Sequence, residues 1–390
     1  MKKRPCLYHF YNEEGAVMVK DLAGAGKTAR AAYSLQKEMD RVRREGIAKG
    51  IVLDTREHVG ELPTTRKLWA VVIGKEPKHK VLFTGCHHAR EWISVEVPFL
   101  LAEYLVDEYP TSAPKNDHER RIKYLVDNRQ IWIVPMVNPD GHEHTRLKDR
   151  EWRGTTRIEA VFHKKKFWAP RLGGGGRTIV VDPGFYSGID PNRNYWTLDW
   201  GHETPATSRD PADGNIWCGF KAESEPETKA IADLIKKEKF RAGMTYHNYS
   251  QLLMYARRTK DDAFVQFVGK GMHQLINERH NPYTYQVLDA LYPTTGNEVD
   301  YHLEKVPRRP VFVTEVRPGP GTTLKHSELP EDQIEPCFHE NLAAALALIC
   351  CAGHDAPSKS EKRGNATSGH RQVKMPVIPN CWKVFEKWVP

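Results

Sequence analysis

Short apolar runs, each about the length of a β-strand, recur along the chain from residue 68 onward. They lie at residues 68–74, 81–86, 130–137, 244–255, 283–288 and 311–316. Runs this short and this continuously apolar are typical of strands that are buried on both faces of a sheet. The pattern therefore predicts a central sheet that is covered on both sides.

Between these runs, apolar residues recur every three or four positions, as they do on one face of a helix. The spacing predicts helices over residues 29–45, 92–108, 224–237, 262–278 and 336–351. Residues 224–227 also have the sequence of a capping box with proline in the first turn. Because strands alternate with helices, we predict an α/β fold, a three-layer sandwich whose mixed, mostly parallel central sheet is flanked by helices.

Composition divides the chain into one compact domain and two attachments. We predict an N-terminal extension with a helix over residues 1–45, a compact domain over 46–352 and a flexible basic tail over 353–390. Within the domain, the lysines and the glycine run of residues 156–185 predict a flexible basic loop. The sequence Asn-Pro-Asp-Gly at residues 138–141 predicts a turn.

The charge balance is basic but modest for a chain of 390 residues, since 58 Lys and Arg face 50 Asp and Glu for a formal net charge of +8. The basic residues gather at 164–166, at 257–258 and in the tail rather than in one stripe. We therefore expect a solvated basic surface and no nucleic-acid partner.

The cysteines and the N-terminus bear on the compartment. Seven cysteines form an odd set without a C-x-x-C pair, which favours a reducing environment. No apolar stretch follows the basic residues 2–4, and we expect no window long enough for a membrane span. We therefore expect a cytoplasmic protein with no membrane partner.

The chemistry of the chain centres on His88 and Glu91. They stand three residues apart at a strand-to-helix junction, so both side chains can reach one ion. The strand before them leads to the edge where open α/β sheets place their sites. His87 is the rival ligand, four residues from Glu91. His247 lies in a later strand-like run and is either a third ligand or an ordinary buried histidine. Three protein ligands would leave the fourth position of a catalytic zinc to water.

Glu315 is a carboxylate inside the apolar run 311–316. Burying a carboxylate without a partner is costly. Glu315 therefore either pairs with a cation such as Arg317 or serves as a base beside a metal.

Seven blocks occur in the order found in one enzyme family. The chain strongly resembles the zinc metallocarboxypeptidases of the pancreatic A/B type, from about Arg66 to Ile349. The blocks that carry the resemblance are Gly85-Cys86-His87-His88-Ala89-Arg90-Glu91-Trp92, Val137-Asn138-Pro139-Asp140-Gly141, Trp152-Arg153, Asp190-Pro191-Asn192-Arg193-Asn194, His247-Asn248-Tyr249-Ser250-Gln251-Leu252-Leu253, Leu291-Tyr292 and Thr314-Glu315-Val316-Arg317.

This resemblance implies that residues 46–352 form a zinc carboxypeptidase catalytic domain. It implies that His88, Glu91 and His247 bind one zinc ion, Zn2+, and that Asp190 is the carboxylate that orients the His88 ring.

The resemblance also implies the catalytic groups. Glu315 is similar to the family's general base, and Arg153 to the cation that polarises the scissile carbonyl.

Four further residues are implied to contact the substrate. Asn192 and Arg193 match the clamp on a free C-terminal carboxylate, so the expected partners are peptide substrates with such an end. Tyr292 resembles the tyrosine that closes over bound substrate, and Arg90 is expected to line the approach.

The preferred C-terminal residue follows from the pocket that the resemblance implies. Val299 aligns with its floor, which favours apolar or aromatic residues; its walls align with Met254, Val287, Leu291 and Val313. Arg258 stands where the family usually has a small residue. If Arg257 or Arg258 points into the pocket, acidic C-termini are preferred instead.

Three functions follow as hypotheses. The first is a zinc-dependent metallocarboxypeptidase, and the second is a zinc-dependent amidase that acts on acylated amino acids or cell-wall peptides. The third is a catalytically idle peptide-binding module. We also interpret the glycine-rich insertion as a candidate lid over the site.

Overall fold

The computed structural model describes residues 35–52, 58–61, 67–74, 78–156, 158–161, 165–181, 184–277, 283–319 and 331–353. Most of the predicted N-terminal extension, and the predicted tail after residue 353, lie outside these residues.

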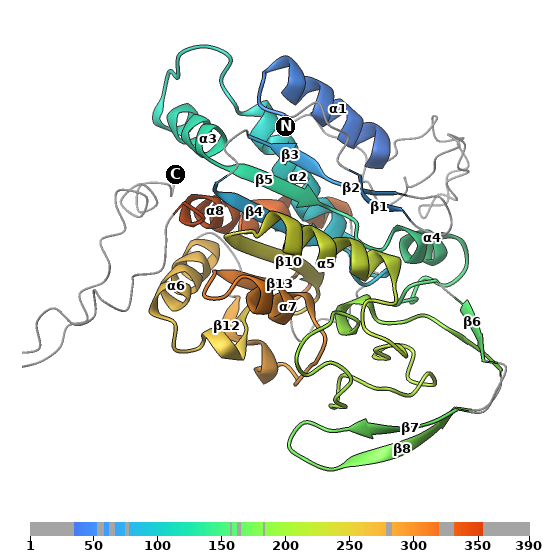
Figure 1. The fold of residues 1–390 in the computed structure, drawn as a ribbon. Helices are drawn as coiled ribbons and strands as arrows, with labels where there is room; N and C mark the ends of the chain where they lie inside the picture. Colours follow the sequence, from blue (N-terminus) through green and yellow to red (C-terminus); the bar gives the residue numbers. More distant parts are fainter. Residues whose placement is uncertain are drawn as a thin grey trace, which may run out of the picture.

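Helices and strands alternate through most of the described part of the chain (Figure 1). The helices are α1 (Leu35–Ala48), α2 (Ile93–Asp107), α3 (Asp117–Asn128), α4 (Pro139–Leu147), α5 (Pro226–Glu238), α6 (Ala263–Asn277), α7 (Glu298–Lys305) and α8 (Ile334–Cys351). The strands are β1 (His58–Glu61), β2 (Lys67–Trp69), β3 (Val71–Ile73), β4 (Lys80–Gly85), β5 (Gln130–Val134), β6 (Ile158–Val161), β7 (Lys165–Pro170), β8 (Gly176–Val181), β9 (Gly184–Ser187), β10 (Ala242–Asn248), β11 (Leu252–Tyr255), β12 (Thr284–Val287) and β13 (Val311–Val316).

Seven strands form the central sheet, in the order β12-β11-β13-β10-β4-β5-β3. The pairs β12/β11, β13/β10, β10/β4 and β4/β5 are parallel, whereas β11/β13 and β5/β3 are antiparallel. The prediction of a mixed, mostly parallel sheet is confirmed.

Side chains of the central strands alternate between two cores, as the pleat of a strand requires. In β4, Val81 and Phe83 belong to the larger core, which includes buried residues of α1, α2, α3, α6 and α8. Leu82 belongs to the smaller core on the other face, with residues of α5 and with Tyr301 of α7. Helices therefore cover both faces of the sheet, as predicted for a three-layer sandwich.

Helix α1 is continuous with the domain that follows it. Leu35, Met39 and Val42 are buried in the larger core, and α1 packs against α2. The predicted boundary between residues 45 and 46 falls inside this helix.

Helix α8 corrects the expectation about membrane-length segments. It is long and apolar enough to cross a membrane, but most of it is buried inside the fold. Its contacts with α2 and α6 identify it as a helix of the larger core.

The predicted turn at residues 138–141 is instead the first turn of α4. The Asn138 side chain accepts a hydrogen bond from the Gly141 amide, and Pro139 occupies the first helical position. Asparagine as the cap and proline in the first turn are favoured in a helix start as well as in a turn.

The predicted flexible loop over residues 156–185 is also corrected. Its described residues form two antiparallel pairs, β6 with β9 and, between them in the chain, β7 with β8. The glycines lie where they are needed, since Gly173, Gly174 and Gly175 have positive φ at the turn between β7 and β8. Figure 1 shows this hairpin projecting from one side of the molecule.

Three smaller differences concern local signals. Helix α5 begins without the predicted capping box, because Glu225 is its cap residue and makes no side-chain capping bond. Strands β10 and β11 replace the single predicted strand over residues 244–255, and β2 and β3 replace the one over 68–74. Helices α3, α4 and α7 were not predicted from the periodicity.

Candidate metal centre

The candidate ligands come from neighbouring strands in the middle of the sheet. Strand β4 leads directly to His88, while β10 carries His247 and pairs in parallel with β13 so that His247 lies beside Glu315. Helix α2 begins shortly after Glu91 and packs closely on this turn. A Cβ on Gly85 would lie 2.0 Å from the Ser94 carbonyl oxygen, so only glycine permits this approach.

Three buried side chains converge on one point. His88 Nδ1 lies 2.6 Å from Glu91 Oε1, His247 Nδ1 lies 3.0 Å from Glu91 Oε2, and the two Nδ1 atoms are 3.1 Å apart. These three residues are the group that could hold a metal ion among the described residues. Two imidazole nitrogens and a carboxylate are a donor set that suits zinc, and their mutual closeness fits a shared cation.

The electrostatics of the cluster favour metal binding. Burial lowers the pKa of His247 to about 4, so its ring is neutral near pH 7 and its lone pair is available. Burial alone would raise the pKa of Glu91, but His88 and His247 hold it well below its usual range.

His87, the rival ligand, lies outside this group. Its Nε2 is 2.8 Å from the Tyr195 hydroxyl and 3.1 Å from Glu298 Oε2, and Glu298 also accepts a hydrogen bond from Thr84. The adjacent histidines therefore face different partners.

Asp190 links the candidate ligands to Arg153. Its Oδ1 lies 3.1 Å from His88 Nε2, and its Oδ2 accepts hydrogen bonds from Arg153 Nε and Nη2 at 3.1 and 3.0 Å. Burial would raise the pKa of Asp190, but Arg153, His88 and Arg193 hold it well below the usual range. Asp190 is therefore a buried anion that orients a ring and a guanidinium at once.

Asn192 and Arg193 lie on a 3₁₀ helix, η2 (Pro191–Arg193), immediately after Asp190. Asn192 Oδ1 accepts a hydrogen bond from the Glu298 amide, which leaves its Nδ2 toward His247 at 3.4 Å. Arg193 Nε donates to the Ala206 carbonyl oxygen at 2.6 Å. Both side chains line the same cavity as His88 and His247.

Glu315 lines this cavity, and one of its carboxylate oxygens, Oε2, is buried without a hydrogen bond to a described residue. Burial and then Glu91 raise the pKa of Glu315 well above its usual value, against the opposing effect of Arg153. Arg317, the cation considered as a partner, instead donates to Glu340 at 2.8 Å.

The cavity at the metal centre is narrow, with a volume of about 20 Å3. Its lining comprises His88, Asn192, Arg193, His247, Leu288, Leu291, Tyr292, Thr294, Asn297, Val299, Val313 and Glu315. Among the predicted pocket walls, Met254 and Val287 are not in this lining, although Met254 packs in the same apolar cluster as Val299.

The remaining predicted site residues, Arg90, Arg153 and Arg258, are not part of the cavity lining. Arg90 donates to the Glu151 carbonyl oxygen, and Arg153 is held by Asp190. Arg258 pairs with Asp300 and Glu304 on α7, so its guanidinium is engaged outside the lining.

Glu298, which the sequence patterns did not single out, contacts two residues next to the centre. Its carboxylate lies beside His87, and its backbone amide fixes Asn192. In the sequence, Glu298 is visible only as an acidic residue next to Val299. Its contacts with His87 and Asn192, which lie far away in the chain, are seen only in the structure.

Comparisons with known proteins identify the family of the chain. The family model described as zinc carboxypeptidase matches residues 54–344. The chain belongs to the zinc carboxypeptidase family.

Relatives agree with this family at moderate identity. A zinc carboxypeptidase of Simulium vittatum is 29% identical over 271 residues, covering 67% of this chain and 77% of that protein. Metallocarboxypeptidase A of Arthroderma otae is 30% identical over 307 residues, covering 75% of this chain and 64% of that protein. The chain thus spans less than two thirds of the fungal relative.

Solved structures agree on the fold. Bovine thrombin-activatable fibrinolysis inhibitor, in complex with tick carboxypeptidase inhibitor, has a TM-score of 0.64 at 23% identity and covers 82% of this chain and 97% of its own. Carboxypeptidase A from Helicoverpa armigera has a TM-score of 0.62 at 20% identity and covers 81% and 72%. The predictions of the family, of a metallocarboxypeptidase and of zinc as cofactor are confirmed at family level.

Proposed function

We propose that this zinc carboxypeptidase is an exopeptidase that removes apolar or aromatic residues, one at a time, from peptides with a free C-terminal carboxylate. The proposal rests on the narrow cavity. It combines metal ligands, an unpaired carboxylate and an arginine with an apolar floor.

His88, Glu91 and His247 would hold the zinc ion. When bound, zinc would lower the pKa of a water molecule and polarise a carbonyl group.

Glu315 acts as the general base. Its unpaired Oε2 faces the cavity that the ligands line, so it can accept a proton from the attacking water. It then passes this proton to the amine that leaves, which is the usual second half of such catalysis.

Arg153 supplies a fixed positive charge beside the ligands. Burial would lower the pKa of Arg153, but Asp190 and Glu91 raise it, so the guanidinium stays charged. A charge held in this way stabilises the oxyanion that develops on the scissile carbonyl.

Arg193 and Asn192 bind the C-terminal carboxylate. Arg193 is buried in the lining, and a guanidinium suits a carboxylate because it can donate two parallel hydrogen bonds. The nearest carboxylate to Arg193, on Asp190, is 4.0 Å away and already pairs with Arg153. A peptide without a C-terminal carboxylate would cover this buried charge without supplying a close anion, at a cost of roughly several kcal/mol. This cost restricts the enzyme to chain ends.

Apolar residues at the base of the cavity favour apolar or aromatic side chains. Val299, Leu291 and Val313 line it. Arg258 is paired with α7 carboxylates and Arg257 with Asp289, so neither supplies a cation for an acidic side chain.

The cavity must widen before a C-terminal side chain enters. Its volume of about 20 Å3 is room for roughly one water molecule. Tyr292 lines this cavity and its ring lies 6.0 Å from the Arg193 guanidinium, so its movement is the simplest route to opening.

Paired peptides that end in a free or an amidated phenylalanine test the proposal. The zinc-loaded enzyme should cleave the free form at least about a hundredfold faster, judged by kcat/KM. Arg193→Ala should remove most of this difference, mainly through KM. Equal cleavage of both forms by the wild type would instead favour the amidase.

Arg258→Ala is the matched control and also tests specificity. The ratio of kcat/KM for peptides ending in phenylalanine and in glutamate should stay within about twofold, because the pairing of Arg258 on α7 keeps it out of the cavity. A strong fall in kcat/KM for the peptide ending in glutamate would show instead that Arg258 contacts the C-terminal side chain.

A further inference from the structure

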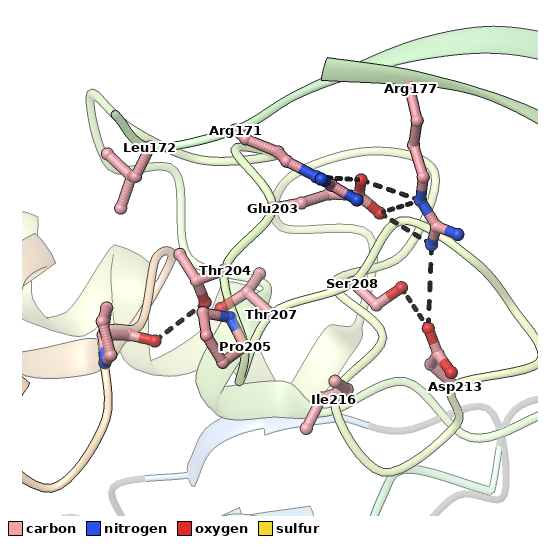
Figure 2. A pocket seen from close by; sticks show the side chains of 11 residues that line it. Arg171, Leu172, Arg177, Glu203, Thr204, Pro205, Thr207, Ser208, Asp213 and Ile216 are labelled. Carbon is pink, nitrogen blue, oxygen red and sulfur yellow. Dashed lines mark hydrogen bonds and ion pairs between the residues drawn. The ribbon is translucent and has the colours of Figure 1, made fainter. Parts of the chain in front are cut away.

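A second cavity, of about 530 Å3, lies between the inserted hairpin and the segment that follows η2 (Figure 2). It is lined by Arg171, Leu172, Arg177, Glu203, Thr204, Pro205, Thr207, Ser208, Asp213, Ile216 and Pro293. A volume of this size is typical of sites for small molecules.

This cavity adjoins the metal centre. Pro293 lines the second cavity, whereas its neighbours Tyr292 and Thr294 line the first. Thr204 Oγ1 donates to the Pro293 carbonyl oxygen at 2.8 Å, and the nearby Ala206 carbonyl oxygen accepts from Arg193. The two cavities therefore share a wall.

One end of the second cavity carries charge. Glu203, 6% exposed, accepts hydrogen bonds from Arg177 Nε at 2.9 Å and Arg177 Nη2 at 3.0 Å. Asp213 accepts a hydrogen bond from the Ser208 hydroxyl at 2.6 Å. Figure 2 shows Arg177 and Glu203 close to the hairpin, and Asp213 linked to Arg177 and to Ser208.

Arg171 is the cation left for a ligand at this end. Its nearest carboxylate oxygen, on Glu203, is 3.9 Å away, and it makes no hydrogen bond with a described residue through its side chain. Glu203 already accepts closer hydrogen bonds from Arg177, so the long ion pair of Arg171 with Glu203 leaves the donors of Arg171 without a hydrogen-bonded anion. An incoming carboxylate would provide one.

The other end is apolar. Leu172, Pro205, Ile216 and Pro293 are the apolar residues of the lining, and Figure 2 shows Leu172 and Pro205 apart from the charged groups. A ligand that fills both ends must join an anionic group to an apolar body.

We propose that this second cavity binds small apolar carboxylates, of the class of an apolar amino acid or dipeptide. Arg171 pairs with the carboxylate, and Leu172 and Ile216 contact the apolar body. The source of the ligand rests on the proposed function, because removal of apolar C-terminal residues would release such molecules next to this cavity.

Isothermal titration of the zinc-loaded full chain with L-phenylalanine tests the proposal. The wild type should show two binding events, one at each cavity. Arg171→Gln should weaken one event roughly ten- to hundredfold, because it removes a charge-assisted contact. Leu172→Ser should weaken the same event, and L-phenylalaninamide should not produce it.

Lys166→Gln is the matched control, since Lys166 is exposed on β7 and lies outside the lining. It should retain both events. Binding of L-phenylalanine that is unchanged within twofold in both Arg171→Gln and Leu172→Ser overturns the proposal, as does equal binding of the amide at this cavity. If the protein cleaves peptides but lacks the Arg171-dependent binding event, this proposal fails while the proposed function stands. If the binding event is present but the protein cleaves no peptide, the proposed function fails while the second binding site stands.

Discussion

Glu315 shows how a single residue can be costly for folding and useful for chemistry. Its Oε2 is buried without a hydrogen-bond partner among the described residues, in a strand whose other residues, apart from Thr314, are apolar. Buried polar groups of this kind are uncommon and often have a catalytic role.

Glu315→Gln tests this role. The variant should retain zinc while kcat falls by roughly a hundred- to ten-thousandfold, because the amide cannot take the proton from water. Steady-state hydrolysis beside a metal assay would measure both. Turnover at the wild-type rate would remove Glu315 from the mechanism.

His302 gives a pH-dependent contribution to stability away from the metal ligands. It is buried, its Nε2 lies 3.0 Å from the Phe240 carbonyl oxygen, and burial lowers its pKa. The unfolded chain, with a histidine pKa near 6.5, therefore binds a proton that the folded protein resists. Stability is full above pH 6.5 and falls as the pH decreases below that value.

Chemical denaturation of the zinc-loaded protein between pH 7 and 5 would measure this effect. The wild type should lose up to about 1.4 kcal/mol per pH unit more than His302→Asn. Parallel pH profiles for the two proteins would show that His302 does not titrate in this way.

At the scale of elements, the apolar strands were predictable and several polar elements were not. Strands β4, β5 and β13 are buried throughout or nearly so, and an apolar run identifies such strands. Helix α4 begins with residues that also favour turns, and α7 is short and mostly polar. Their neighbours in space, rather than their composition, decide their structure.

The sequence of the β7/β8 hairpin contains β-branched residues that favour a strand, but the neighbouring glycine run led to the prediction of a loop. Residues 178–180 are Thr-Ile-Val, and Ile179 is buried whereas Val180 is exposed, which is the alternation of a strand. None of the described hairpin residues lines the metal cavity, so its interpretation as a lid over that cavity stays a prediction.

Helix α1 should contribute to the stability of the whole domain because its apolar side is part of the larger core. Met39→Ala should lower the free energy of unfolding by roughly 2–5 kcal/mol. Arg44→Ala, on the exposed side of the same helix, should change it by no more than about 0.5 kcal/mol. Urea unfolding of both variants would measure the contrast, and similar losses would argue against a packed α1.

For the whole molecule, the family blocks predicted the ligand set more securely than any local pattern did. His87 and His88 both satisfied the spacing rule with Glu91, and contacts with Tyr195, Glu298 and Thr245, from distant parts of the chain, assign His87 elsewhere. The ion pairs of Arg258 with Asp300 and Glu304 on α7 could not be predicted from the sequence either. The cytoplasmic location stays a prediction.

Removal of zinc should affect activity and stability together. Exhaustive chelation should abolish peptide cleavage and lower the Tm, since a ligand at 100 times its Kd stabilises the folded state by about 2.7 kcal/mol. Added zinc should restore both, as followed by calorimetry and steady-state rates. A full cleavage rate in metal-free protein would refute the metal centre.

The shared anchor at Asp190 has a mechanical consequence. One carboxylate accepts from the His88 imidazole, which would hold the zinc ion, and from the guanidinium of Arg153. An ion of another radius, by shifting the imidazole, would also re-aim the guanidinium. Replacement of the metal should therefore change the positions of both the His88 ring and the Arg153 guanidinium, and neither position can be adjusted without the other.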